Sequence, residues 1–483
     1  MVDRRLRTGV HPASAHRQRV YRDRPDRPLP GISRPAGRDF RRPIADRVRS
    51  RAMKINGPIT PQRSAWRLTA VPAPHCPVFG RDVTADVAII GGGYAGLNAA
   101  IRCNELGLKA VVLEAEDPGF GGSGRNGGQV IPGLKFDPNT LLEMFGEKHG
   151  RPLIDFAGNA PDRTFDTIRR YGMQCDAEQN GWLQPATNQA TAGKILKRAA
   201  AWRDMCDVPV QLLDAQMTFA ATGTRLFSSA WIDPRGGQLQ PLSYSRELAR
   251  VAMDGGSEVF QHSPASKISR TGDTWTVSCN GHDLKASAVL VCTNGYSGGL
   301  IRGLAESLVP ASSIICATPP LPDDLRRTIL PSGLPLSDAR RLLTYLRFDP
   351  AGRLLIGARG SFNLKEPESY FRRLRRAAVA MFPQLGGIAW EAAWGGRFAL
   401  TADQIPHVHN PEPGLYAAVG CNGRGIAMLS QMGRLLSDLA NGMAAEDAPI
   451  PLGKVKPIPF HRFRRFGLEA VTLWYRALDQ TGR

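Results

Sequence analysis

The alternation of apolar and polar residues first becomes regular near residue 85. Asp86–Ile90 (DVAII) is a short apolar, β-branched run of the kind that forms a buried strand. A glycine-rich turn follows, and Leu97–Leu106 then has the pattern of a helix that ends at Gly107. Leu108–Leu113 is a second apolar run of strand type. The pattern therefore predicts a strand, a glycine turn, a helix and a second strand, in that order.

The turn between the first strand and the helix reads GGGYAG and fits the spacing G-x-G-x-x-G. Gly91 permits a tight turn, Gly93 lets a pyrophosphate approach the backbone, and Gly96 lets the helix lie close to the strand. The first helical turn offers unpaired N–H groups and a positive dipole end to the phosphates. Glu114 ends the second strand. It follows Gly91 by close to the ~20 residues expected of a carboxylate that hydrogen-bonds an adenosine ribose. This arrangement predicts a dinucleotide site, for either NAD or FAD.

Glycine turns next to predicted strands or helices recur at three later places in the chain, 120–129 (FGGSGRNGGQ), 293–295 (TNG) and 420–425 (GCNGRG). Open α/β sheets bind their ligands at the carboxyl ends of parallel strands, where such turns lie. A nicotinamide dehydrogenase usually confines its cofactor to one contiguous domain. Because the turns come from both ends of the chain, they favour a large, permanently bound dinucleotide, which is FAD.

The other segments alternate between helical and strand patterns. Residues 139–171 and 192–205 have helical periodicity, and the Lys and Arg side chains of the second helix are interpreted as a solvated face. Trp182–Ala186 is of strand type. Two strand-like runs, RLLTYLRF and GRLLIGAR, flank a turn at 349–352 and predict a hairpin. Glu368–Met381 predicts a further helix.

These patterns predict an α/β protein with two domains. The first is a FAD-binding, Rossmann-like domain of the glutathione-reductase type, and the second is a discontinuous α+β substrate domain built on an antiparallel sheet. The FAD-binding domain is assigned residues 53–135, 238–300 and 396–445. The substrate domain is assigned residues 136–237 and 301–395. Residues 446–483 are interpreted as a linker and an amphipathic, basic helix. Trp66 in the Pro-rich lead-in either packs on the body of the protein or is a surface anchor, and the surface anchor is favoured.

The net charge of +19 at first suggests a nucleic-acid partner, but its distribution weakens that idea. Residues 1–52 hold fifteen Arg and five Asp and show no apolar period, so they are interpreted as a disordered basic extension. Three explanations compete: a solvated tail, an organelle-targeting peptide, or an upstream start codon with Met53 as the true start. Targeting peptides are poor in acids, so the five Asp argue against one. We expect no nucleic-acid partner.

Composition limits the remaining classes. With 42% hydrophobic residues the chain resembles an ordinary globular protein. No run reaches the ~18 apolar residues that a membrane helix needs, and no signal peptide is recognisable, so we expect a cytoplasmic protein without a transmembrane segment. The eight cysteines are scattered and none form C-x-x-C, which argues against a metal site or a disulfide framework.

Several of these segments together resemble the D-amino-acid-oxidase-like superfamily of FAD-dependent oxidoreductases. They are the fingerprint 85–114, GFGGSGRNGGQ at 119–129, AVLVCTNGY at 288–296, WGGRFALTADQIPH at 394–407 and the turn at 420–425. Within that superfamily, SGRNGGQ and the C-terminal FHRFRRFGLEAVTLWYRALD resemble the gamma-glutamylputrescine oxidoreductase branch. The resemblance implies oxidation of the C–N bond of a small amine or amino-acid-like substrate. Hydride passes to the flavin, the imine hydrolyses, and O₂ or another acceptor reoxidises the flavin.

The resemblance also implies roles for individual residues. Arg397 falls where carboxylate-binding relatives have an arginine that grips the substrate acid, a task that suits a guanidinium fork; a structural ion pair or a flavin contact is the alternative. Tyr345 is a weaker candidate for the pocket wall. Sarcosine-oxidase-like relatives attach flavin through a cysteine at the position of Gly396, which predicts non-covalent FAD here. Cys421 lies in a glycine turn that could approach the flavin, so a covalent bond to this cysteine would contradict the prediction. No catalytic acid or base is assigned.

We expect the cofactor to contact residues from all four turns and from the strands and loops beside them. They are Gly91, Gly93, Tyr94, Ala95, Gly96, Glu114, Ala115, Ser123, Arg125, Asn126, Gly127, Gly128, Gln129, Ala265, Thr293, Asn294, Gly295, Gly420, Gly423, Arg424 and Gly425.

Three other functions stay open at this point. Some relatives of this fold modify tRNA, a flavoprotein can retain FAD as a binding protein without oxidising amines, and a nicotinamide-dependent dehydrogenase would use the same fingerprint. The identity of the amine, the electron acceptor and the oligomeric state are likewise open.

Overall fold

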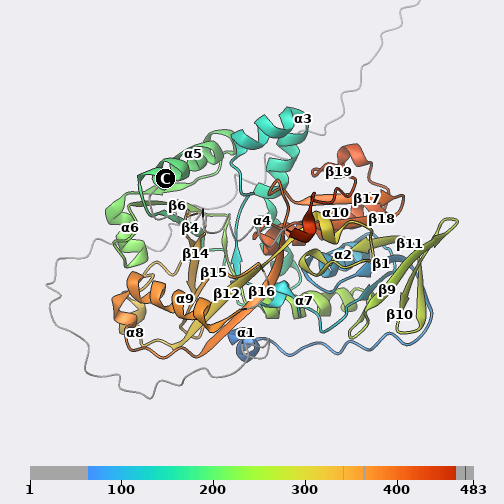
Figure 1. Cartoon of the computed structure of the whole chain (residues 1–483), viewed down its shortest axis with the longest axis horizontal. Coiled ribbons are helices and arrows are strands. Elements are labelled where there is room, and N and C mark those ends of the chain that lie inside the picture. The colour runs from blue at the N-terminus through green and yellow to red at the C-terminus, as the bar shows by residue number, and fades with distance from the viewer. Residues whose placement is uncertain (1–63, 341, 363–365, 464–473, 475–483) are drawn as a thin grey trace, which may run out of the picture. The chain divides into compact units, whose positions relative to one another are not determined.

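The computed structural model describes residues 64–340, 342–362, 366–463 and 474 (Figure 1). The predicted extension 1–52 and most of the predicted C-terminal helix lie outside the described residues. Among the described residues, no helix combines the length and the apolar character that crossing a bilayer requires.

The first sheet carries the predicted dinucleotide fingerprint. β1 pairs in parallel with β2 on one side and with β11 on the other, β2 pairs in parallel with β8, and β11 pairs in parallel with β18. An antiparallel meander, β9 and β10, extends from β11, and β17 and β19 complete the other edge. The nine strands of this sheet are β1 (Val83–Ile90), β2 (Ala110–Leu113), β8 (Glu258–Phe260), β9 (Ala265–Thr271), β10 (Thr274–Cys279), β11 (His282–Val291), β17 (His407–Glu412), β18 (Leu415–Val419) and β19 (Leu452–Gly453).

Helices pack on this sheet through a shared apolar core. α2 (Tyr94–Glu105) lies between α7 (Pro241–Asp254) and α10 (Gly425–Ala440), as Figure 1 shows around β1. α10 can approach α2 closely because Gly433 has no side chain: a Cβ there would lie 2.0 Å from the Ala95 carbonyl oxygen. The close approach brings the N-termini of both helices to the carboxyl ends of β1 and β18.

The second sheet is mostly antiparallel. Its order is β16-β12-β15-β14-β13-β4-β6-β5, and only the β13–β4 pair is parallel. α9 (Glu368–Met381) packs on β12 and β15, and α5 (Gln189–Cys206) packs on β4 and β6. The eight strands are β4 (Trp182–Ala186), β5 (Gln211–Leu213), β6 (Ser229–Asp233), β12 (Val309–Pro320), β13 (Leu336–Ser337), β14 (Thr344–Phe348), β15 (Arg353–Arg359) and β16 (Ala392–Leu400).

Shorter elements connect the two sheets. β3 (Gln129–Val130) pairs with β7 (Gly237–Gln238), and the side chain of Gln129 donates to the carbonyl oxygens of Leu336 and Leu346 in the second sheet at 2.9 and 3.1 Å. The remaining α-helices of the described residues are α1 (Ala65–Thr69), α3 (Pro138–Gly158), α4 (Ala160–Arg170), α6 (Ala215–Thr222) and α8 (Asp323–Arg326).

The predicted α/β class, with a parallel dinucleotide-binding sheet and an antiparallel sheet, is confirmed. The strand 182–186 and the helix 368–381 have the predicted bounds, and β14 and β15 form the predicted hairpin. The helical stretch 139–171 is two helices, and the first of them is kinked at Gly146, where φ is 67°. The domain boundaries stay a prediction, and β16 runs across the one at residue 396.

Trp66 is not the surface anchor that the sequence suggested. Its side chain is fully buried and meets Trp394 edge to face, with the ring centroids 5.8 Å apart. Its indole N–H donates to the carbonyl oxygen of Asn126 at 2.8 Å. Trp66 therefore helps to hold the loop 120–129 in place through this hydrogen bond.

Candidate active site

A cavity of about 1280 Å³ runs between the two sheets. Its walls include the carboxyl ends of β1, β2 and β11, the turn before α10, and side chains of β4, β12, β14 and β16. The cavity therefore joins the predicted nucleotide turn to the face of the antiparallel sheet. Drug-sized ligands occupy about 300–1,000 Å³, so this volume suits a dinucleotide together with a small substrate.

The nucleotide end is shaped by backbone that side chains would fill. Gly91 has a φ of +108°, and a Cβ on Gly96 would lie 1.9 Å from the carbonyl oxygen of Gly91. Glu114 accepts a hydrogen bond from the backbone N–H of Gly92 at 2.6 Å and one from Glu116 at 3.0 Å. Burial raises the pKa of Glu114, and these N–H donors oppose the rise. The carboxylate is thus held at the end of β2, where a ribose is expected.

The loop 120–129 is fixed mainly by its own side chains. The amide of Asn126 donates to Tyr94 Oη at 3.0 Å and to the Ser123 carbonyl oxygen at 2.7 Å, and its oxygen accepts from the N–H of Gly128 at 2.9 Å. The Tyr94 hydroxyl in turn donates to Ser123. Asn126 and Tyr94 both line the cavity, but their polar atoms are largely committed to holding the loop.

Two glycines of this loop are required by close packing that the sequence did not reveal. A Cβ on Gly127 would lie 2.5 Å from the ring of Tyr345, and one on Gly128 would lie 2.3 Å from Arg347. Arg347 donates to the carbonyl oxygens of Gly128 and Leu239 at 2.9 and 2.7 Å. Close packing against the second sheet therefore already requires glycine at both positions.

Of the predicted cofactor contacts, all but Gly96, Gly128 and Gly420 line the cavity. Each of these three packs against protein instead, and a Cβ on Gly420 would lie 2.3 Å from Thr401. Both predicted substrate contacts, Arg397 and Tyr345, line the cavity as well. The Tyr345 hydroxyl is 2.8 Å from Ser313 Oγ, and burial raises its pKa.

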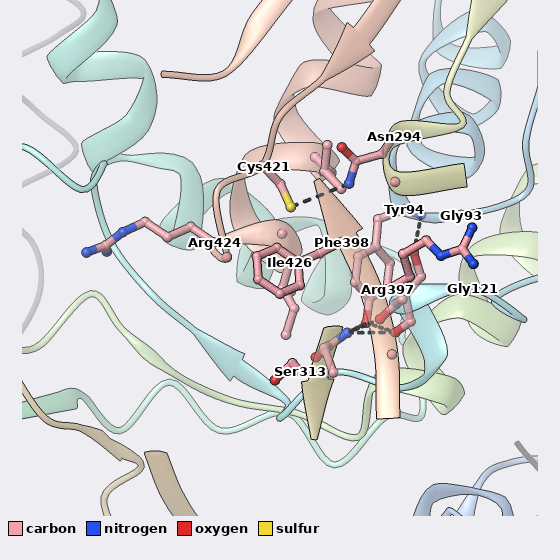
Figure 2. Close-up of a pocket in the computed structure, with 18 of the residues that line it drawn as sticks. Gly93, Tyr94, Gly121, Asn294, Ser313, Arg397, Phe398, Cys421, Arg424 and Ile426 are labelled. Atoms are coloured by element: carbon pink, nitrogen blue, oxygen red, sulfur yellow. Dashed lines mark hydrogen bonds between the residues drawn. The ribbon is translucent and has the colours of Figure 1, made fainter. Parts of the chain in front are cut away.

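The turns at 293–295 and 420–425 are joined by one side chain. Asn294 accepts from the backbone N–H of Gly420 at 3.0 Å and donates to Cys421 Sγ at 3.4 Å, a contact drawn as a dashed line in Figure 2. Burial raises the pKa of the Cys421 thiol. A protonated thiol is a poor nucleophile, so its surroundings do not activate it.

Arginines cluster where β16 meets the loop 120–129. Arg125 lies over the ring of Phe120 at 4.3 Å, and its Nη2 is buried with no hydrogen-bond partner among the described residues. Arg397 lies over the ring of Tyr296 at 5.0 Å. Glu366 faces Gly395, where a Cβ would lie 1.8 Å from its Oε1. Burial raises the pKa of Glu366 to about 7, and Arg125 opposes that rise.

Glu366 was not among the predicted site residues, because no motif surrounds it. Gly395 and Gly396 were the available signal: the first leaves room for Glu366, and a Cβ on the second would lie 3.0 Å from Arg125 Cβ. The basic face of α5 is not wholly solvated, contrary to the prediction. Lys194 and Arg198 on that helix line the cavity, as do Lys135, Arg340, Arg359 and Arg424. Among the described residues there is no group of three or more metal-binding side chains.

The fold and the cavity define a dinucleotide-dependent oxidoreductase in which one site spans both sheets. Residues 86–439 match the family described as FAD dependent oxidoreductase (DAO), so the chain belongs to this family of enzymes, and its cofactor is FAD.

Individual relatives are more distant. The chain is 29% identical to gamma-glutamylputrescine oxidoreductase of Escherichia coli (strain K12) over 387 residues, which cover 78% of this chain and 90% of the relative. It is 28% identical over 430 residues to the probable oxidoreductase OrdL of Rhizobium meliloti (strain 1021), covering 89% of this chain and 100% of the relative.

Solved structures share the fold at lower identity. Glycine oxidase from Geobacillus kaustophilus superposes with a TM-score of 0.65 at 22% identity, covering 77% of this chain and 99% of that one. L-proline dehydrogenase from P. horikoshii superposes with a TM-score of 0.62 at 18% identity, covering 76% and 96%.

Proposed function

We propose that this enzyme oxidises the C–N bond of an amine or amino-acid-like substrate. The observation that carries the proposal is the single cavity that joins the glycine turn of β1 to the face of the antiparallel sheet. A substrate bound at Tyr345 and Arg397 would share that cavity with the reactive end of the cofactor. The named activities of the relatives, on gamma-glutamylputrescine, glycine and L-proline, are all oxidations or dehydrogenations of nitrogen compounds, and they support this class.

The residues present fit FAD at several independent points. Gly91 and Gly93 leave room for the pyrophosphate beside the N-terminus of α2, and Glu114 stands at the ribose position. The unpartnered Nη2 of Arg125 supplies a buried donor to a ligand oxygen. FAD supplies a two-electron acceptor for the hydride of the substrate.

The side chains of this chain position the substrate. Arg397 binds a carboxylate on the carbon that loses hydride, if the substrate has one, and Tyr345 closes the wall beside Ser313. An amine that binds in its neutral form needs no strong base, because hydride loss leaves an iminium that gives up its proton to water. The imine product is then hydrolysed. We expect FAD to be held non-covalently, since the family resemblance aligns Gly396 with the cysteine that attaches flavin in sarcosine-oxidase-like relatives, and burial raises the pKa of the Cys421 thiol.

The test is anaerobic mixing of the holoenzyme with a panel of amines and amino acids, including gamma-glutamylputrescine. Loss of the flavin absorbance at ~450 nm identifies a substrate. Gamma-glutamylputrescine is the specific compound that we propose, because one relative named for its oxidation is 29% identical to this chain. Retained FAD with no bleaching by any compound would contradict amine oxidation and would favour a FAD-retaining binding protein.

A further inference from the structure

Two consecutive carbonyl oxygens of the loop 120–129 accept hydrogen bonds from buried indoles. Trp394 Nε1 donates to the carbonyl oxygen of Arg125 at 3.0 Å, and Trp66 Nε1 donates to that of Asn126 at 2.8 Å. Both tryptophan side chains are fully buried, so neither indole N–H has water as an alternative partner. Neither tryptophan lines the cavity, whereas Arg125 and Asn126 do. The two carbonyl groups are therefore turned away from the cavity.

The direction of these carbonyl groups fixes the direction of the next two N–H groups. In a planar trans peptide the C=O of one residue and the N–H of the next point in opposite directions. Both peptide bonds are trans. The carbonyl that Trp394 binds shares its peptide unit with the N–H of Asn126, and the carbonyl that Trp66 binds shares its unit with the N–H of Gly127. Each indole therefore turns one N–H toward the cavity.

These two N–H groups find no acceptor in the described part of the chain. Among its hydrogen bonds, none has the backbone N–H of Asn126 or Gly127 as the donor. The neighbouring groups are satisfied, because Arg125 N–H donates to the Gly122 carbonyl oxygen at 3.3 Å and Gly128 N–H donates to Asn126 Oδ1 at 2.9 Å. Successive N–H groups that point the same way bind negatively charged or electron-rich atoms. The loop thus offers two adjacent donors to a ligand.

The tryptophan pair is held rigidly by its own contacts. The two rings meet edge to face at 5.8 Å and 74°. The guanidinium group of Arg347 lies 5.2 Å from the ring of Trp66 and donates to the Gly128 carbonyl oxygen at 2.9 Å. The side chain of Gln240 donates to the carbonyl oxygen of Trp66 at 2.8 Å, which ties α1 to the start of α7. Donors fixed in this way are preorganised before any ligand binds.

The two donors lie where the cavity meets the antiparallel sheet. A Cβ on Gly127 would lie 2.5 Å from the ring of Tyr345 on β14. The predicted nucleotide contacts Gly91 and Glu114 instead follow β1 and β2 of the other sheet. Because the reactive ring of the cofactor must adjoin the substrate, this ring, and not the pyrophosphate, is the part of FAD that reaches Asn126 and Gly127.

We propose that Trp66 and Trp394 are positioning residues that aim the N–H groups of Asn126 and Gly127 at an acceptor atom of the flavin ring. This inference rests on the proposed function, in which the flavin accepts a hydride. A hydride adds negative charge to the flavin, and preorganised N–H donors stabilise negative charge as it develops. The tryptophan pair therefore favours reduced over oxidised FAD and raises the reduction potential of the bound cofactor.

Phenylalanine at either position removes the indole donor and keeps an aromatic ring. Trp66→Phe acts on the N–H of Gly127, and Trp394→Phe acts on that of Asn126. Anaerobic reduction of the holoenzyme beside a reference dye gives the reduction potential of bound FAD and requires no amine. We expect each variant to favour the reduced form about tenfold less than the wild type does, a fall of about 30 mV for a two-electron couple. The absorbance bands of the flavin should shift as well.

Trp275→Phe is the matched control. Trp275 is also buried and donates to a backbone carbonyl oxygen, that of Pro413, at 3.3 Å, but it does not line the cavity or contact the loop 120–129. Each of the three variants loses one hydrogen bond from a buried indole, so the midpoint of thermal unfolding should fall comparably in all of them. Only Trp66→Phe and Trp394→Phe should lower the potential. An equal fall in Trp275→Phe would refute the inference, because the fall would then be a general effect of destabilisation.

The remaining outcomes are equally decisive. FAD is added in excess to any variant that is purified without it, so that the potential is measured on bound cofactor. An unchanged potential in both loop variants overturns the inference. A higher KM for an amine with an unchanged potential also contradicts it, because the donors would then bind the substrate. The proposed function is tested separately: a protein that no amine bleaches can still show the fall in potential, and an amine oxidase can lack it.

Discussion

The nucleotide end of the cavity is lined mostly by backbone, from glycines and the N-termini of α2 and α10. Another part of the cavity, which we call the basic end, is lined by the long cationic side chains of Lys135, Arg198, Arg359 and Arg424, and neutral oxygens accept hydrogen bonds from two of them, Arg198 and Arg424. The first arrangement recognises phosphates and a ribose that every FAD carries. The second depends on charges that differ from one substrate to another. We therefore expect the cofactor and the substrate to be bound by different chemistry within one cavity.

The largest effect should come from closing the nucleotide end. In Gly96→Ala the new Cβ would lie 1.9 Å from the carbonyl oxygen of Gly91, so α2 must move away from β1. We expect a loss of about 3 kcal/mol or more in the free energy of unfolding and a purified protein without bound FAD. The ratio of flavin to protein absorbance measures this.

Gly193→Ala is the control for that substitution. Gly193 lies in α5, and a Cβ there would meet open space, so alanine should leave FAD content unchanged and stabilise the helix by up to about 1 kcal/mol. Normal FAD content in Gly96→Ala would show that the nucleotide end tolerates a side chain there. It would contradict the view that this end, unlike the basic end, depends on closely packed backbone.

Arg397 also lines the cavity, and its replacement should have an intermediate effect. If Arg397 binds a substrate carboxylate, Arg397→Met should raise KM or lower kcat/KM about 10- to 100-fold for carboxylate substrates, because a charge-assisted bidentate contact is lost. FAD content should stay unchanged. An equal loss for substrates with and without the carboxylate would favour the alternative role as a flavin contact.

Glu366 should affect stability as a function of pH. The folded protein raises its pKa from 4.5 to about 7, so the neutral carboxyl is preferred in the folded state. The stability that it contributes is complete below pH 4.5 and is lost as the pH rises through 7. Glu366→Gln should therefore be more stable than the wild type at pH 8, by about 2 kcal/mol after allowance for partial exposure, and similar at pH 5. Thermal unfolding from pH 5 to 9 measures the difference, and a constant difference across that range would contradict it.

The smallest effect should come from Cys421→Ser. Because FAD is proposed to be non-covalent, acid precipitation should release the yellow colour into the supernatant from the wild type and the variant alike. A yellow pellet from the wild type that turns colourless in Cys421→Ser would show a covalent bond to this sulfur.

The sequence predicted the nucleotide end well, because its signals are local. A strand, a turn with fixed glycine spacing, a helix and Glu114 lie within one short stretch of sequence. The glycines of the turn are required by backbone conformation or by close approach of neighbouring atoms. The hairpin of β14 and β15 and the helix α9 were predicted for the same reason.

The basic end could not be predicted, because its residues come together only in the folded chain. Lys135, Arg198, Arg359 and Arg424 belong to four segments without a common motif. The helical period of α5 separates its polar face from its apolar face, but it does not say whether the polar face meets water or a cavity. Burial of Trp66 was missed for a similar reason, since its partner Trp394 lies far along the chain.

The hydrogen bond from Gly420 to Asn294 spans 126 residues of sequence, and it has a consequence for biosynthesis. The ribosome adds residues one by one, at roughly 5–20 per second, so the fingerprint at Gly91 emerges long before the turn that completes the cavity. A nascent chain that stops before α10 lacks one wall of the cofactor site. We therefore expect FAD to bind only after the turn at 420–425 has been synthesised and folded.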